Sequence, residues 1–301
     1  MPLIWMGEKL ERALLLVNFG GPRDLQELGP FMEELLCDQD VIQTKWPAAI
    51  HRLLFKRIAR KRVARIHEEY ERMGGGSPIF GDTERLAMQG SRTLQRPCLT
   101  FHRYLPATHQ DSLRALEEIA DQVDVIDVLP LFPQFSFTTT GSCARWFKRR
   151  ASCSLLKKLA WVRSYEDHEE FIGAYQEQVA RFLATCSHVP EKTILLFSAH
   201  GLPVRYVHEG DPYPEQCRRS VKAIADAFPG TTPLLAFQSR FGREEWLRPY
   251  TVELAGELRG LYPQHDLVLV IPVAFTSDHL ETLVEIEREI LPVLREGGFR
   301  A

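Results

Sequence analysis

The stretch TILLFSAHGLP, residues 193–203, joins a run of apolar and β-branched residues directly to a polar segment that contains His200. The run lacks the alternation of a half-buried strand, so we expect a strand that is buried on both faces. Similar runs recur along the chain with amphipathic helical stretches between them. This alternation predicts a doubly wound α/β fold with parallel sheets. The other expected strands are residues 13–19, 99–105, 123–132, 159–163, 234–237 and 267–275, and the expected helices include 111–121, 167–184, 213–228, 246–261 and 279–295.

The length of 301 residues suits one large α/β domain or two smaller ones, because single hydrophobic cores stop growing at about 250 to 300 residues, and we expect two lobes. Basic and polar residues are concentrated at 148–158, which is typical of a crossover between lobes. We therefore expect an N-terminal lobe over residues 1–155 and a C-terminal lobe over 156–301. The strands before the crossover should form one sheet, and those after it another.

Composition limits the classes of function. The chain is 45% hydrophobic and 26% charged, which is ordinary for a soluble globular protein, and its formal net charge of −3 gives no support to nucleic-acid binding. The basic stretch 56–65 is interpreted as a solvated helix face. No apolar run reaches the length of a membrane span, and residues 1–10 lack a secretory signal pattern. We expect a cytoplasmic protein, soluble or at most peripheral to a membrane.

The six cysteines are scattered without a C-x-x-C pair. This spacing predicts neither a zinc site nor a disulfide framework, and it fits a reducing cytosol.

Polar residues follow almost every expected strand. Ligands of open parallel sheets bind beyond the carboxyl ends of the strands, so these positions decide where chemistry can occur. We expect them to converge on one cleft. They are Asn18 to Gly21, His102 to Tyr104, Phe132 to Ser136, Ser198 to His200, Gln238 to Arg240, and Thr276 to His279.

His200 ends the opening stretch, where a histidine can act as a base near neutral pH. A core histidine satisfied by backbone groups is the alternative, and the residue alone leaves both open. Three acids, Glu281, Glu285 and Glu289, are spaced four residues apart on the last expected helix and so share one face. Such a row could carry protons or guide a hard divalent cation, whereas Glu287 fits an exposed face.

Two further features bear on the ligand. Residues 74–78, GGGSP, predict a turn whose backbone can approach a ligand closely, although they lack the lysine of a P-loop. Phe132, Phe135 and Phe137 precede the polar stretch 138–142, which suits a flat apolar ligand, with core packing as the competing interpretation.

Taken together, these motifs resemble the ferrochelatase family over residues 13 to about 290. The resemblance rests on NFGGP (18–22), GGGSP (74–78), FPQFS (132–136), TTTGS (138–142), FSAHGLP (197–203), GDPYP (210–214) and FTSDHLETL (275–283). It implies a chelatase-like fold of two Rossmann-like lobes with a porphyrin cleft between them. The implied activity, that of a lyase, is insertion of Fe²⁺ into protoporphyrin IX, the terminal step of haem biosynthesis, with release of two protons.

The resemblance also implies roles for individual residues. His200 matches the proton acceptor and Glu281 its carboxylate partner, and both match residues that meet the metal. The implied proton and metal path consists of Asp278, His279, Glu285 and Glu289. The implied porphyrin-binding residues are Phe19, Arg62, Arg65, Ser77, Arg103, Tyr104, Ser239, Trp246 and Phe275.

The resemblance implies porphyrin and ferrous iron as substrates and no bound prosthetic group. No cysteine follows Cys217, so we expect no C-terminal [2Fe-2S] cluster. Residues 31, 32, 35 and 36 match an apolar lip that touches the membrane in some members, with core packing as an equal alternative, and contact with the inner membrane stays open. We expect a monomer or weak dimer. A coproporphyrin III ferrochelatase, a cobalt or nickel chelatase and a non-catalytic haem-binding protein are the alternative functions.

Overall fold

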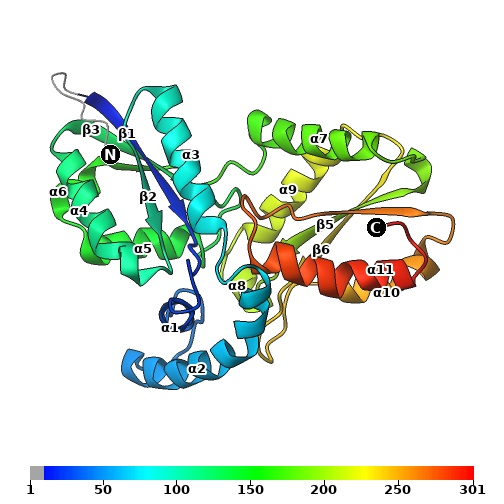
Figure 1. Ribbon diagram of the computed structural model, residues 1–301, viewed down its shortest axis with the longest axis horizontal. Helices are drawn as coiled ribbons and strands as arrows, with labels where there is room; N and C mark the ends of the chain where they lie inside the picture. Colours follow the sequence, from blue (N-terminus) through cyan, green and yellow to red (C-terminus); the bar gives the residue numbers. More distant parts are fainter. Residues whose placement is uncertain (1–9) are drawn as a thin grey trace. The chain divides into compact units, whose positions relative to one another are not determined.

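The structure is a computed structural model that describes residues 10–301, so the predicted absence of a signal in residues 1–10 lies almost entirely outside the described residues. The chain forms two compact units (Figure 1). Unit 1 continues to Leu131 and resumes at Phe137–Arg163, and unit 2 consists of Phe132–Ser136 and Ser164–Ala301. Each unit contains one parallel sheet, which confirms the predicted α/β class.

Unit 1 contains a four-stranded sheet in the order β2-β1-β3-β4, with all pairs parallel. Alternate residues of β1 enter opposite layers, as the strand geometry requires. Leu16 packs against Ala87 of α3 on one face. Phe101, paired with Val17, contacts Trp146 of α5 on the other, with ring centroids 4.5 Å apart. The elements are β1 (Leu10–Asn18), α1 (Leu28–Leu36), α2 (Ala48–Arg72), α3 (Ile79–Leu94), β2 (Cys98–His102), η1 (Pro106–Thr108), α4 (His109–Ala120), β3 (Val123–Pro130), α5 (Thr140–Arg150), α6 (Cys153–Lys158) and β4 (Leu159–Trp161).

Unit 2 contains a three-stranded parallel sheet with β5 between β6 and β7. Leu195 and Phe197 pack with α7 and α9, while Ile194 and Leu196 pack with α10 and α11. Figure 1 shows these two pairs of helices on opposite faces of the sheet. The continuous apolar run over residues 193–197 is therefore buried on both faces of the sheet. The elements are α7 (Glu169–Ala184), η2 (Pro190–Lys192), β5 (Thr193–His200), α8 (Val204–His208), α9 (Tyr213–Ala225), β6 (Thr232–Gln238), α10 (Thr251–Leu261), β7 (Leu267–Ile271), η3 (Glu281–Ile290) and α11 (Leu291–Glu296).

A short segment from the middle of the chain, residues 132–136, belongs to unit 2. Gln134 donates from Nε2 to Ser220 Oγ at 2.9 Å, and the Ser136 hydroxyl donates to Asp211 at 2.8 Å. The backbone N–H of Phe135 donates to the Gln216 side chain at 2.6 Å. Unit 2 is therefore completed by residues that precede the end of unit 1 in the sequence.

The sequence places the strand near residue 160 in the second sheet, and this prediction is wrong. β4 pairs with β3 in unit 1, with Leu159 opposite Ile126. Lys158, expected to lie in the crossover, donates from Nζ to the carbonyl oxygen of Val123 at 2.8 Å. The side chain of Leu155 in α6 is fully buried, so the basic stretch returns the chain to the sheet it came from.

Helix α10 begins at Thr251 and not at residue 246. Trp246 lies in an antiparallel bridge with Pro203, and the Pro249 carbonyl accepts a hydrogen bond from Phe237 N at 2.9 Å. A proline is poorly placed inside a helix because it has no N–H to donate. Residues 246–250 therefore form no helix, and Tyr250 makes a parallel bridge with Phe237 of β6.

The helix predicted over residues 279–295 begins as a π-helix, η3, and continues as α11. A π-helix closes its hydrogen bonds over five residues, and such segments are rare and are often found at functional sites. None of the helices within residues 10–301 is long and apolar enough to cross a bilayer.

Candidate active site

The strand order of unit 2 identifies one edge of its sheet as a ligand site. β6 lies on one side of β5 and β7 on the other, and the helices that follow β5 and β7 pack on opposite faces of the sheet. Ligands of open α/β sheets bind in the crevice at such a switch point. His200 is the last residue of β5, and the loop after β7 leads to Glu281 at the start of η3.

The imidazole of His200 has a defined hydrogen-bonding pattern. Its Nδ1 lies 2.7 Å from the carbonyl oxygen of Gly201, and a carbonyl can only accept, so Nδ1 carries the proton. The neutral ring then keeps a lone pair on Nε2. The rings of Trp246 and Phe275 flank it, each with its centroid 6.4 Å away. His200 is thus arranged to accept a proton at Nε2.

His279 and Glu281 form a pair in unit 2, with Nε2 3.2 Å from a carboxylate oxygen. The Nδ1 atom of His279 is buried and has no hydrogen-bond partner among residues 10–301. Phe275 lies beside this ring, with centroids 4.8 Å apart, and it also flanks His200. Tyr175 of α7 donates to the Phe275 carbonyl at 3.0 Å and thereby holds the loop in place. The structure therefore brings His200, His279 and Glu281 to one end of unit 2.

The residues of the predicted proton and metal path differ in burial. Asp278 is exposed and accepts a hydrogen bond from the Thr282 hydroxyl at 3.0 Å. Glu285 is half-buried, whereas Glu289 is exposed. Among residues 10–301, no group of three or more histidine, cysteine or acidic side chains is arranged to hold a metal ion.

In unit 1, the two glycine motifs pack against each other. Ser77 N donates to the Pro22 carbonyl at 2.7 Å. A Cβ on Gly21 would lie 2.7 Å from that of Ser77, and one on Gly76 would lie 2.3 Å from the Arg23 carbonyl oxygen. Both positions therefore require glycine for close backbone approach. The Ser77 hydroxyl, buried beside this contact, has no hydrogen-bond partner in the part of the chain that the structure describes.

We expect Gly76→Ala to destabilise unit 1 by about 1 to 3 kcal/mol, because the added methyl group must displace backbone. Gly173 in α7 offers a control, since its added Cβ would meet nothing within 4 Å. Gly173→Ala should be neutral or stabilising by up to about 1 kcal/mol. Thermal unfolding of the two variants measures the difference, and equal midpoints would contradict the interlocked packing of the glycine motifs.

Phe19 is half-buried at the end of β1, where its ring lies 4.5 Å from that of Tyr104 and 6.2 Å from that of Phe31, centroid to centroid. The expected apolar lip includes Phe31, Met32 and Leu36, all of which are buried. Core packing thus explains these three side chains.

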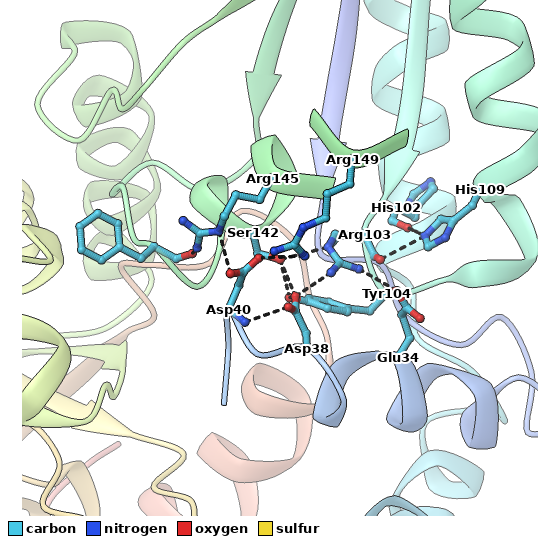
Figure 2. Close-up of polar contacts among 11 residues, drawn as sticks. Glu34, Asp38, Asp40, His102, Arg103, Tyr104, His109, Ser142, Arg145 and Arg149 are labelled. Carbon is cyan, nitrogen blue, oxygen red and sulfur yellow. Dashed lines mark hydrogen bonds and ion pairs between the residues drawn. The ribbon is translucent and has the colours of Figure 1, made fainter. Parts of the chain in front are cut away.

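Arg103 and Tyr104 lie in a buried polar network of unit 1, drawn in Figure 2. The guanidinium donates to Asp38 at 2.6 Å, to Glu34 at 2.9 Å and to Ser142 at 3.0 Å. The Tyr104 hydroxyl donates to Asp38 at 3.0 Å. The network therefore occupies polar groups that the resemblance assigns to the porphyrin.

Burial raises the pKa of Tyr104 well above its usual range, and the charge of Asp38 adds to this rise. The phenol therefore stays protonated and can act as the donor to Asp38. Ser142 also donates to the same carboxylate oxygen, at 2.6 Å. Asp38 is thus the common acceptor of the network.

The other predicted porphyrin residues lie at different depths. On α2, Arg62 is half-buried and Arg65 exposed. Ser239 is hydrogen-bonded to Glu285 within unit 2. Trp246 is 8% exposed, and its indole N–H has no hydrogen-bond partner within the described residues. A ligand oxygen could accept from this N–H group or from the Ser77 hydroxyl.

A cavity of about 910 Å³ lies in unit 1, and of the predicted site residues only Arg103 lines it. Its other cationic residues are Arg52, Arg60, Arg149 and Arg150.

Sequence reasoning missed several residues that hold the predicted site residues of each unit in place. Asp38 follows an amphipathic stretch and has no distinguishing local pattern, while Tyr175 lies inside a helix whose sequence indicates only packing. Gln238 and Ser198 stood at expected strand ends without an assigned role. Strand-end position is the only signal that could have selected the latter two.

Comparison with known proteins gives a consistent result. A family model described as ferrochelatase matches residues 11–301. A ferrochelatase of Chlamydia muridarum (strain MoPn / Nigg) is 44% identical over 286 residues, which cover 95% of this chain and 86% of that protein. A ferrochelatase of Chlamydia caviae (strain ATCC VR-813 / DSM 19441 / 03DC25 / GPIC) is 41% identical over 289 residues, which cover 96% and 88%.

A solved periplasmic component of an ABC-type sugar transport system from Hahella chejuensis covers 95% of this chain and 76% of its own, with 11% identity and a TM-score of 0.30. A likeness this low has no bearing on function. The family match over almost the whole chain and the identity to the chlamydial proteins agree with the resemblance found in the sequence. This chain belongs to the ferrochelatase family, whose members insert metal into porphyrin in haem synthesis.

Proposed function

We propose that this chelatase inserts Fe²⁺ into protoporphyrin IX to give protohaem, and that His200 accepts the two pyrrole protons released. The observation that carries this proposal is the hydrogen bond from His200 Nδ1 to the Gly201 carbonyl, 2.7 Å long. It leaves Nε2 as the basic atom at the carboxyl end of β5. A neutral imidazole with a fixed tautomer suits general-base catalysis near neutral pH.

The chemistry requires a base because a free-base porphyrin carries two N–H protons in the plane that the metal must enter. Bending the macrocycle would turn the nitrogen lone pairs toward the iron, and binding at its edges would offset the strain. Nε2 has one lone pair, so it must release the first proton before it accepts the second. Each proton that leaves a pyrrole nitrogen for Nε2 frees a nitrogen lone pair to bind the metal. Exchange of two protons for Fe²⁺ keeps the charge balanced.

Glu281 is proposed as the carboxylate partner in this exchange. One of its carboxylate oxygens lies 3.2 Å from His279 Nε2, which is close enough for a proton to pass between the two groups. The pair could therefore take protons onward from the site. Asp278 and Glu289 are the proposed continuation of this path, whereas Glu285, expected on the same path, is proposed to position η3.

The edges of the porphyrin need polar partners for their propionates. Arg62 and Arg65 could supply cationic charge. The buried Ser77 hydroxyl, which has no partner among residues 10–301, could donate a hydrogen bond to a propionate. Phe19, Trp246 and Phe275 are proposed to contact the ring faces. Arg103 and Tyr104 fit a supporting role better, because the Asp38 network already occupies their polar groups.

Coproporphyrin III is the alternative substrate. It differs from protoporphyrin IX in carrying propionates where protoporphyrin IX has vinyl groups. The test is to incubate the protein anaerobically with each porphyrin and Fe²⁺ and to follow the loss of the free-base absorption bands. A higher kcat/KM for protoporphyrin IX supports the proposal, and a higher value for coproporphyrin III identifies the other substrate. Porphyrin binding without metal insertion in both reactions would instead indicate a haem-binding protein. Parallel reactions with Co²⁺ and Ni²⁺ test the choice of metal.

A further inference from the structure

The carboxylate of Glu285 is held by the end of strand β6. Ser239 N donates to Oε1 at 2.7 Å, and the Ser239 hydroxyl donates to Oε2. Gln238 donates to the same Oε2 from Nε2 at 3.0 Å. A carboxylate that receives three hydrogen bonds from fixed donors is suited to holding a structure, and less suited to handing protons or iron along a path.

Gln238 connects this carboxylate to both elements of the proposed catalytic pair. Its Nε2 also donates to the backbone carbonyl of Glu281 at 2.9 Å. Its Oε1 accepts from the Ser198 hydroxyl at 2.6 Å, and its backbone lies opposite His200 in the β5–β6 register. The residue is only 4% exposed. One buried amide therefore links the strand that ends in His200 to the helix that begins at Glu281.

Ser239 has a left-handed backbone, with φ of 64°. Residues other than glycine adopt this conformation rarely, and they keep it where the surrounding structure determines it. At Ser239, Glu285 accepts from both the N–H and the hydroxyl. The strained residue thus marks the point at which β6 is tied to η3.

We infer that Glu285, Gln238 and Ser239 form a positioning lock that fixes Glu281 relative to His200. Glu285 acts in this lock as an anchor for the π-helix, and metal insertion depends on it through geometry. The inference rests on the proposed function, because it concerns the spacing of the proposed base and its carboxylate partner.

The first test is Glu285→Gln. The new amide keeps the shape of the side chain but presents N–H groups where only acceptors fit, so the lock opens. Misplacement of a reacting group by about 1 Å can cost about 100-fold in rate, and we expect a fall in kcat of that order. The KM for Fe²⁺ should stay within about twofold. Glu287→Gln is the matched control, since Glu287 is an exposed residue on the same helix.

Two Ser239 variants separate the lock from a path. Both Ser239→Gly and Ser239→Ala lose the hydroxyl and keep the N–H group, but only the glycine variant relieves the left-handed strain, so the lock predicts a higher kcat for Ser239→Gly than for Ser239→Ala. The double variant Glu285→Gln/Ser239→Ala should be no slower than Glu285→Gln alone, because both changes open the same lock. Porphyrin affinity is measured by fluorescence for the same variants, because a loss of affinity would reveal a contact between Ser239 and a propionate.

Failure of the lock is distinguishable from failure of the proposed function. If the wild type inserts no metal into either porphyrin, the proposed function is wrong. If the wild type is active, the lock is overturned by a Glu285→Gln variant that raises the KM for Fe²⁺ at unchanged kcat, or by strictly additive effects of the two substitutions. If Glu285→Gln does not fold, the kcat values of the two Ser239 variants still test the lock. A kcat for Ser239→Gly that is no higher than that of Ser239→Ala overturns it.

Discussion

Replacing His200 by alanine is expected to slow metal insertion by at least about 100-fold, the usual contribution of a positioned general base. The expectation follows from the tautomer: Nδ1 is engaged by the Gly201 carbonyl, so the lone pair of Nε2 is the basic function that alanine removes. Porphyrin affinity should change little, because the flanking Trp246 and Phe275 rings remain. Single-turnover loss of the free-base bands under anaerobic conditions measures the rate, and quenching of porphyrin fluorescence measures binding.

His208→Ala is the control for this experiment, because His208 is an exposed histidine at the end of α8. Its rate should equal that of the wild type. Equal rates for the two alanine variants would remove His200 from the mechanism. Loss of porphyrin binding in His200→Ala would point to a binding role in place of proton transfer.

Asp38→Asn is expected to destabilise unit 1 by about 3 kcal/mol, as is typical when one partner of a buried ion pair is removed. The Asp38 and Arg103 side chains are 3% and 5% exposed, so water cannot replace the lost charge. Glu34 remains 2.9 Å from the guanidinium and keeps the effect at the low end of the usual range. The substitution also exchanges an acceptor oxygen shared by Tyr104 and Ser142 for a group that can donate.

The midpoint of urea unfolding measures this loss, provided that the slope of the transition is unchanged. Among residues 10–301, a Trp246→Phe background leaves Trp46, Trp146 and Trp161, all in unit 1, so their fluorescence follows that unit. Asp111→Asn is the matched control, because Asp111 pairs with Arg114 at the surface, where the side chains are 82% and 69% exposed. It should cost less than about 1 kcal/mol. A similar midpoint for both variants would show that the network contributes little stability.

The strands were predictable because a strand buried on both faces must be continuously apolar. The limits of β5 show where this reasoning ends: the apolar run stops at Phe197, but the strand continues to His200. Ser198 is fully buried there, since its hydroxyl pairs with Gln238 and with Thr251. A polar residue satisfied by distant partners cannot be told from a strand end in the sequence alone.

The helix of the acidic row shows a second limit. Its apolar and charged pattern indicates a helix, but α and π geometries place residues four apart on nearly the same face, so spacing does not separate them. The contact of Glu285 with Ser239 spans 46 residues and depends on a left-handed backbone. Strand-end reasoning gathered candidates for the site, whereas the assignment of partners required the fold.

Residues 132–136 bear on how this protein is made. Their partners in unit 2 lie 75 to 86 residues later in the sequence, so the segment leaves the ribosome well before Asp211, Gln216 and Ser220 are synthesised. A truncated polypeptide that ends at residue 163 would contain the segment without any of these partners. Because the chain passes from one unit to the other after Leu131, after Ser136 and after Arg163, no single cut in the gene yields two complete halves.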